Sequence, residues 1–289
     1  MVCPNCFPNK PEGFYMDGFM KENLDILVKQ IVKDFDFVIL ISGSGTVRVG
    51  KSVIGQQVGY YLNYMMGQKH KIDNTFDLSN IVFRGEELIA KAKNLPKYSV
   101  IVFDEAGADL LGRKFMVSTT QAVLDFFREC GQLNLFLVVI LPDYFDLPKG
   151  IAITRSVCLL DVYFTQGFER GTGKFFGREK KKNLYIWGKK LMNYQCVKPD
   201  FRFSFTDFYT LDEAKYRELK YCALTGRKKQ DNEAVLSRRA MNQIAQRNIC
   251  IVLLNRKYHM PPIDIAKSLN ITEVLISQIL KDYENKEIF

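Results

Sequence analysis

Residues 37–52 read Phe-Val-Ile-Leu-Ile-Ser-Gly-Ser-Gly-Thr-Val-Arg-Val-Gly-Lys-Ser, and this stretch decides the fold. Its first five residues are apolar and mostly β-branched or large, and the serines and glycines of 42–45 end the run. The run is too short for a typical globular helix. We therefore predict a strand that is buried on both faces of a sheet.

A glycine-rich loop follows this strand directly. Residues 45–52 match the pattern G-x-x-x-x-G-K-[ST] between a strand and a helix, which is the context this pattern requires. The amides of such a loop and the N-terminus of the following helix attract phosphate groups. Lys51 is expected to reach the β- and γ-phosphates of ATP, and the Ser52 hydroxyl to bind Mg²⁺. The predicted nucleotide-binding residues are Gly45, Thr46, Val47, Arg48, Val49, Gly50, Lys51 and Ser52.

An acidic pair ends a second buried strand, expected at 99–103. Four apolar residues, 100–103, lead to Asp104 and Glu105. Asp104 suits a magnesium ligand that acts through water, and Glu105 suits the base that orients an attacking water. Taken alone, the segment is also compatible with a strand that ends in a solvated acidic turn. Combined with the loop at 45–52, it predicts a nucleotide hydrolase.

Helices and buried strands alternate along the first 165 residues. The pattern predicts helices at 17–33, 51–66, 85–93 and 119–130, and strands at 37–41, 99–103, 135–141 and 157–163. Buried strands that alternate with helices are typical of a parallel sheet covered on both faces. The predicted fold class is therefore α/β, with a core that ends near residue 165.

These motifs resemble the P-loop NTPases, in the division that inserts one strand between the loop strand and the acidic strand. Residues 126–141, FFRECGQLNLFLVVIL, resemble the helix, arginine and strand of the FtsK-HerA superfamily of DNA-pumping ATPases. The zonula occludens toxin-like phage proteins have a similar order. The resemblance covers about residues 35–165. It implies a RecA-like fold, ATP and Mg²⁺ as cofactors, and a homo-oligomer that acts on DNA.

The resemblance also implies a catalytic role for Arg128, as a finger that reaches the nucleotide of a neighbouring subunit, with Arg155 in reserve. A structural interpretation stands beside it, in which Arg128 pairs with Asp125 or caps its own helix near Gly131. The family usually ends its third strand with a polar sensor, often Gln. This strand ends in Leu-Pro-Asp, which leaves Asp143 as the substitute.

Basic residues are concentrated after residue 163. Residues 1–163 hold 17 Lys and Arg against 18 Asp and Glu, residues 164–200 hold 9 against 3, and residues 201–289 hold 15 against 11. The distribution indicates a near-neutral core whose later parts meet a polyanion, or an uneven solubilising surface. We expect a basic hairpin at 168–190, whose tip either contacts nucleic acid or is only solvated. Its candidate contacts are Arg178, Lys180, Lys181 and Lys182.

A mostly helical tail is expected at 201–289, with a linker near 226–230. Residues 260–280, MPPIDIAKSLNITEVLISQIL, resemble a helix-turn-helix. Pro262 suits the first turn of a helix, Asn270 tolerates a left-handed turn, and Thr272 can cap the second helix. The expected DNA contacts on that helix are Ser277, Gln278 and Lys281. A helix pair that docks protein is the alternative.

The predicted domains are a lead-in segment at 1–34, an ATPase domain at 35–200 and a DNA-binding domain at 201–289. Seven dispersed cysteines indicate reduced thiols, and Cys3 and Cys6 lack the second half of a zinc site. The longest apolar window, 135–141, is too short to span a membrane. We expect a cytoplasmic protein, in the host cytoplasm if a phage encodes it.

The leading hypothesis is a Mg²⁺-dependent ATPase that packages or transfers DNA for a phage or mobile element. The sequence does not identify a nuclease or portal partner. One alternative is a P-loop nucleotide kinase in which residues 170–182 form a lid over phosphates. The other is a DNA-binding regulator that is switched by nucleotide.

Overall fold

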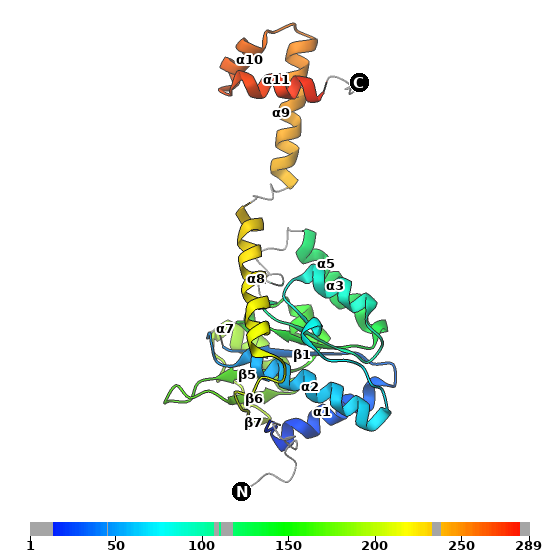
Figure 1. Ribbon diagram of the computed structural model, residues 1–289. Helices are drawn as coiled ribbons and strands as arrows, with labels where there is room; N and C mark the ends of the chain where they lie inside the picture. The colour runs from blue at the N-terminus through cyan, green and yellow to red at the C-terminus, as the bar shows by residue number, and fades with distance from the viewer. Residues whose placement is uncertain (1–13, 45, 107–109, 111–117, 233–237, 284–289) are drawn as a thin grey trace. The chain divides into compact units, whose positions relative to one another are not determined.

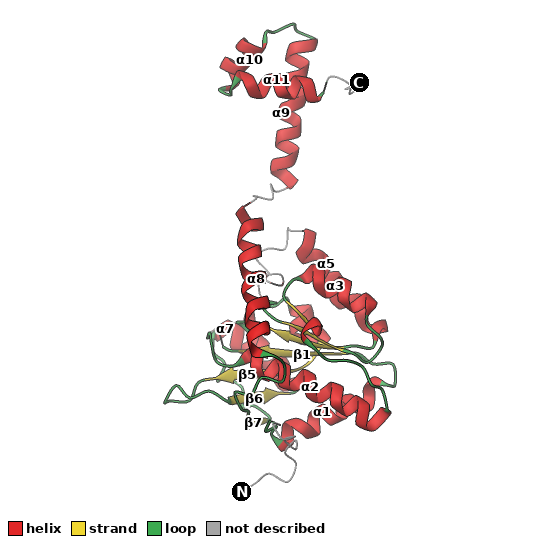
Figure 2. Ribbon diagram, viewed as in Figure 1, coloured by secondary structure: helices red, strands yellow, loops and turns green. Residues whose placement is uncertain are grey.

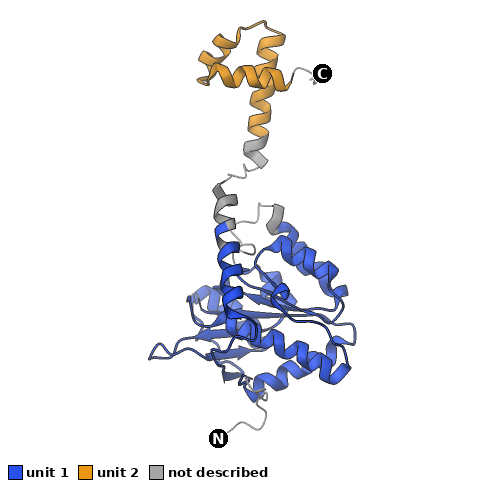
Figure 3. Ribbon diagram, viewed as in Figure 1, with its two compact units in different colours: residues 1–227 blue, residues 228–289 orange. Residues whose placement is uncertain are grey.

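The protein is described by a computed structural model at residues 14–44, 46–106, 110, 118–232 and 238–283. It divides into two compact units, Met1–Arg227 and Lys228–Phe289, and each is described by itself (Figure 3). The division lies at residue 227, not at the expected 200. Residues 201–227 belong to the first unit because they add a strand and most of a helix to it.

Among the helices of the first unit, those at 18–31, 51–70, 85–94 and 118–129 lie close to the positions that the sequence predicts, whereas no helix was predicted at 178–191 (Figure 2). Their bounds are α1 Gly18–Ile31, α2 Lys51–His70, α3 Gly85–Asn94, α5 Ser118–Glu129, α6 Arg178–Asn183 and α7 Lys189–Leu191, with α8 Glu213–Asn232 running on past residue 227. Asp17 caps α1, because its carboxylate accepts hydrogen bonds from the amides of Phe19 and Met20.

A single sheet of seven strands forms from the described residues, in the order β2-β3-β4-β1-β5-β6-β7. The strands are β1 Phe37–Ser42, β2 Ile81–Val82, β3 Val100–Phe103, β4 Phe136–Ile140, β5 Ser156–Tyr163, β6 Thr172–Phe176 and β7 Phe201–Ser204. The first five are parallel to one another, and β6 and β7 are antiparallel additions beside β5. Because β4 lies between β1 and β3, the α/β fold with the RecA-like P-loop arrangement is confirmed.

Both faces of the sheet are covered, as a central parallel sheet requires (Figure 1). Every residue of β1 is buried. Ile39 and Ile41 contribute to one core with the apolar faces of α1 and α2. Val38 and Leu40 contribute to a second core with α3 and α5. The continuous apolar run of β1 therefore serves two cores at once.

The basic hairpin expected at 168–190 is wrong: of it only one strand forms, β6. That strand pairs with β5 before it, and residues 178–191, which include the expected basic tip, are helical. Lys181 is fully buried, and its ammonium donates to the carbonyls of Ala152 at 2.8 Å and Ser156 at 2.6 Å. Burial lowers the pKa of Lys181 to about 8. Lys181 therefore holds the segment before β5 in place and does not contact nucleic acid.

The second unit contains α9 Arg238–Arg256, α10 Pro262–Leu269 and α11 Glu273–Asp282. Apolar residues from all three helices form its core: Ile251, Val252, Ile265, Ala266, Ile276 and Ile279. Asn270 adopts the expected left-handed conformation, with φ 52°, between α10 and α11. Thr272 lies at the N-terminus of α11 but makes no side-chain capping bond. The helices and turn lie where expected, and their binding of DNA stays a prediction.

None of the helices within the described ranges is both long and apolar enough to cross a membrane. The CxxC residues, Cys3 and Cys6, lie outside those ranges.

Candidate functional site

The glycine-rich loop connects the end of β1 to the start of α2. Gly45 lies outside the described residues, and the rest of the loop is placed. Gly50 has φ 98°, and a β-carbon there would lie 3.0 Å from the ring of Phe205. A β-carbon at Gly43 would lie 2.8 Å from Nζ of Lys51. The same β-carbon would also lie 2.9 Å from Cγ2 of Val49 and 3.0 Å from the carbonyl of Thr46. Glycine is therefore favoured at Gly50 by its conformation and at Gly43 by the close approach of the loop.

Lys51 is held by the loop itself. Its Nζ donates to the carbonyl of Thr46 at 2.6 Å, and the amide of Thr46 donates to the carbonyl of Gly43 at 2.7 Å. Val49, where many such loops have a small residue, is fully buried and packs into the core beneath the loop. Burial lowers the pKa of Lys51, and the nearby carboxylate of Glu105 counteracts this shift. The loop thus presents a preorganised cation to a bound anion.

The acidic pair lies beside the loop. Asp104 follows β3 directly and is 1% exposed. Its carboxylate accepts hydrogen bonds from the hydroxyl of Tyr216 and from Nζ of Lys220, the latter at 3.2 Å. Glu105 pairs with the same ammonium at 2.8 Å. Two side chains of α8 therefore contact the acidic pair, which local sequence patterns did not predict.

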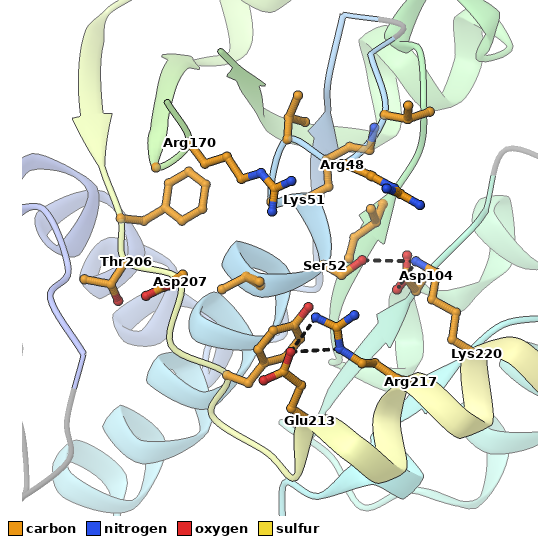
Figure 4. A pocket seen from close by; sticks show the side chains of 18 of the residues that line it. Arg48, Lys51, Ser52, Asp104, Arg170, Thr206, Asp207, Glu213, Arg217 and Lys220 are labelled. Carbon is orange, nitrogen blue, oxygen red and sulfur yellow. Dashed lines mark hydrogen bonds and ion pairs between the residues drawn. The ribbon is translucent and has the colours of Figure 1, made fainter. Parts of the chain in front are cut away.

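Ser52 and Asp104 face a common point. Nζ of Lys220 lies 3.2 Å from the hydroxyl oxygen of Ser52 and 3.2 Å from Oδ2 of Asp104, so one cation already bridges the two (Figure 4). Hydroxyl and carboxylate oxygens are the ligands that Mg²⁺ prefers, usually completed by phosphate oxygens and water. The residues present therefore fit Mg²⁺. Within the described ranges, no group of three or more His, Cys, Asp and Glu residues is arranged to hold a metal without such help.

A pocket of about 1170 Å³ opens above the loop and the acidic pair, and the drawing shows basic side chains entering it from several segments (Figure 4). Arg170 comes from the hairpin between β5 and β6, and Arg217 comes from α8. Arg217 is bound to Glu213 through Nε at 2.8 Å. The cations that line the pocket are Arg48, Lys51, Arg170, Arg217 and Lys220. Five acidic residues line it as well: Asp104, Glu105, Glu169, Asp207 and Glu213. The lining is therefore mixed in charge, and a polyphosphate would be held by the cations of the loop and the hairpin, with a metal ion at the acidic pair.

Asp161 on β5 supports the loop from below. Its buried carboxylate accepts hydrogen bonds from the hydroxyls of Ser42 at 3.1 Å and Ser44 at 2.8 Å. Burial raises the pKa of Asp161 to about 6, although the hydrogen bonds and Lys174 act in the opposite direction. Asp161 was not among the predicted site residues, although an acidic residue within an otherwise apolar strand could have identified it from the sequence. Asp161 therefore connects β5 to the start of the glycine-rich loop at 45–52, the phosphate loop of the proposed function.

Arg128 and Arg155 have different environments. Arg128 pairs with Asp125 at 2.8 Å on its own helix, and its side chain is 71% exposed. Arg155 is largely buried, forms an ion pair with Asp36 and donates to the carbonyl of Phe127. The reserve role of Arg155 as a finger is therefore wrong, because its guanidinium is committed to the fold. Arg128 does not line the described pocket of its own chain.

Asp143 is also committed to the fold. Its Oδ1 accepts hydrogen bonds from the hydroxyl of Tyr194 at 2.6 Å and from the amide of Phe145 at 2.8 Å. It caps the short helical turn at Tyr144–Asp146 and does not line the pocket. The expected sensor role of Asp143 is therefore not supported by its position.

The predicted nucleic-acid contacts lie in both units. Arg178 and Lys182 are exposed on α6, and Lys180 pairs with Asp200 at 2.8 Å. On α11 of the second unit, Ser277, Gln278 and Lys281 are exposed. Ser277 and Lys281 line a depression there together with Asn255 and Arg256 of α9. These side chains are accessible to a ligand, unlike that of Lys181.

No protein-family model matches the chain, and no curated protein matches it. Among solved structures, B204, the DNA-packaging ATPase from Sulfolobus Turreted Icosahedral Virus, is 15% identical over 51% of this chain and 95% of its own, with a TM-score of 0.33. B204 from Sulfolobus turreted icosahedral virus 2, with sulfate, is 12% identical over 62% and 100%, with a TM-score of 0.33. A variant of RuvB from Thermotoga maritima is 10% identical over 91% and 85%, with a TM-score of 0.31. With these low identities and TM-scores, the similarities carry no argument about function, which is argued below from the geometry of the site.

Proposed function

We propose that this protein is a Mg²⁺-dependent ATPase that acts on DNA. The observation that carries the proposal is the meeting of Ser52, Asp104 and Glu105 at one point beside the phosphate loop. Ser52 and Asp104 would hold the ion, directly or through water, and Lys51 would contact the β- and γ-phosphates. When bound, Mg²⁺ would neutralise charge on the phosphates.

Glu105 is the proposed base. It follows the metal-binding Asp104 by one residue and lines the same pocket as the loop. From that position its carboxylate would orient a water toward the γ-phosphate and accept a proton from it. The glutamate distinguishes a hydrolase from a nucleotide kinase, because a kinase transfers phosphate to a bound acceptor rather than to water.

The kinase alternative loses its other support. Its lid was expected at residues 170–182, but Thr172–Phe176 is a strand hydrogen-bonded between β5 and β7. Residues 178–183 form a helix fixed by buried Lys181. A segment inside the sheet is unsuited to open and close over phosphates, and Arg170 alone of the basic residues in 170–182 lines the described pocket.

DNA is the proposed partner, and two accessible surfaces support this. Arg178 and Lys182 are exposed cations four residues apart on α6, and Trp187, further along the helical stretch 178–191, is 58% exposed. Cations beside an exposed aromatic ring suit phosphates and bases. In the second unit, the exposed face of α11 supplies Ser277, Gln278 and Lys281.

We further propose that the protein is a homo-oligomeric motor for packaging or transfer of DNA in a phage or mobile element, working in the host cytoplasm. The exposed side chain of Arg128 supports this, since an arginine that acts on a neighbouring subunit has to project from the surface of its own subunit. Phosphate release from Mg·ATP with and without DNA tests the function. We expect turnover that DNA stimulates and that Lys51→Ala abolishes, whereas slow turnover unaffected by DNA would favour the nucleotide-switched regulator.

A further inference from the structure

Helix α8 reaches into the proposed catalytic site with two side chains one turn apart. The hydroxyl of Tyr216 donates to Oδ2 of Asp104, and Nζ of Lys220 lies 3.2 Å from the same oxygen. Lys220 is separated from Asp104 by 116 residues of chain. A helix that follows the last strand of the sheet is therefore anchored on the acidic residue at the end of β3.

Lys220 is surrounded by the oxygens that the proposed function assigns to Mg²⁺ and to the attacking water. Nζ lies 3.2 Å from Oγ of Ser52 and 2.8 Å from Oε1 of Glu105, in addition to its contact with Asp104. An ammonium has three N–H donors, and these three side chains can accept all of them. Burial lowers the pKa of Lys220, but the two carboxylates more than offset this effect, so the side chain stays charged.

We propose that Lys220 is an internal cation that occupies the magnesium position, so that Lys220 and Mg²⁺ bind there as alternatives. This inference rests on the proposed function. Mg²⁺ binds oxygen ligands at about 2.0–2.1 Å. An ion bound to Ser52 and Asp104 would lie within a few ångströms of the ammonium, where like charges repel. Loading the site with metal therefore requires Lys220 to withdraw.

The same contact inhibits catalysis. While Nζ of Lys220 is bound to Glu105, that carboxylate is paired with a cation and is not available to orient water. Entry of Mg·ATP would exchange one cation for another and release Glu105 in the same step.

Mn²⁺ binding to the nucleotide-free, full-length protein tests the exchange directly. Binding is measured as the loss of the free Mn²⁺ signal in electron paramagnetic resonance. Lys220→Met removes the charge and keeps a long side chain. We expect it to tighten Mn²⁺ binding by about tenfold or more, because the competing cation is gone. Lys220→Arg keeps the charge and should retain weak binding. Unchanged or weaker Mn²⁺ binding in Lys220→Met would overturn the proposal.

Lys215→Met is the matched control. Lys215 lies on α8, its side chain is 72% exposed, and it pairs with Asp212 at 3.7 Å rather than lining the pocket. We expect its Mn²⁺ affinity to equal that of the wild type. Thermal unfolding provides a second readout: Mg²⁺ should raise the midpoint of Lys220→Met more than that of the wild type or of Lys215→Met. An equal Mg²⁺ effect on all three proteins would contradict the exchange.

Nucleotide binding separates this inference from the proposed function. With a fluorescent ADP, the Mg²⁺ concentration for half-maximal binding should be about tenfold lower in Lys220→Met than in the wild type. If wild type and variants bind no nucleotide, the proposed function fails, and the Mn²⁺ comparison still decides on Lys220. If they bind ADP with the same dependence on Mg²⁺, the function stands and the exchange at Lys220 is wrong.

Discussion

The hydroxyl of Tyr216 on α8 donates a hydrogen bond to the buried carboxylate of Asp104 at the end of β3. Burial raises the pKa of Tyr216, so the phenol keeps its proton and remains a donor. The contact joins two segments 112 residues apart. Glu213, Arg217 and Lys220 of the same helix line the pocket, although the sequence pattern assigned this helix to the DNA-binding tail.

Asp161 predicts a specific dependence of stability on pH. Its pKa is raised from 3.8 to about 6, so the folded state holds a proton that the unfolded state releases between these values. The resulting stabilisation is present below about pH 4 and lost as the pH rises through 6. Relative to Asp161→Asn, the wild type should therefore lose up to about 3 kcal/mol of unfolding free energy between about pH 4 and pH 7.

Urea denaturation of both proteins over this range provides the measurement. Because other carboxylates titrate in both proteins, the difference between the two unfolding free energies isolates Asp161. A difference that stays constant with pH would mean that Asp161 does not titrate in this window.

Arg128 and Arg155 should separate catalysis from stability. Removing Arg155 leaves the largely buried carboxylate of Asp36 without its ion pair. Arg155→Ala should therefore cost about 3–5 kcal/mol of unfolding free energy. Arg128→Ala loses only an exposed pair with Asp125 and should change stability by less than about 0.5 kcal/mol.

For ATP turnover, measured on folded protein, Arg128→Ala should have the larger effect of the two substitutions. If Arg128 acts on a neighbouring subunit, Arg128→Ala should lower turnover by orders of magnitude at unchanged ATP affinity. Mixing it with Lys51→Ala should restore part of the activity, because each variant supplies what the other lacks. Absence of any rescue would refute action between subunits.

Truncation after Arg227 tests the role of the second unit. The sheet, the phosphate loop, Tyr216 and Lys220 all precede this residue, so the truncated protein should fold and retain basal ATPase activity. Its affinity for DNA should fall. The log–log slope of affinity against salt should flatten by about 0.9 for each lost phosphate contact with duplex DNA. Unchanged affinity and slope would assign the tail to protein docking and leave the exposed cations of 178–190 as the DNA contact.

The parallel core was predictable because its signals are local. The apolar runs of β1, β3, β4 and β5 and the pattern at 45–52 each lie within a few consecutive residues. Strand β7 was missed because it has only four residues. Strand β6 was expected in a hairpin with the residues that follow it, whereas it lies between β5 and β7, and its Gly173, where the ring of Phe203 packs against the backbone, weakens its pattern. Antiparallel additions of this length carry no distinct periodicity.

The candidate site divides in the same way. Lys51, Ser52, Asp104 and Glu105 were predicted by motif, and the structure brings them to one pocket. Lys181 was misassigned because a basic run does not reveal which ammonium is directed to buried carbonyls. Lys220 contacts Ser52 and Asp104, which are more than a hundred residues away in the chain, so a local sequence pattern cannot predict these contacts.

The central claim is that Glu105 acts as the base of an ATP hydrolase at this site, and Glu105→Gln tests it most directly. The amide keeps the size and hydrogen bonding of the side chain but accepts no proton. With ATP binding and single-turnover phosphate release measured on the same sample, we expect affinity within a few-fold of the wild type and release slower by about 10²-fold or more. Phosphate release at the wild-type rate, or an equal loss of binding and release, would contradict this account.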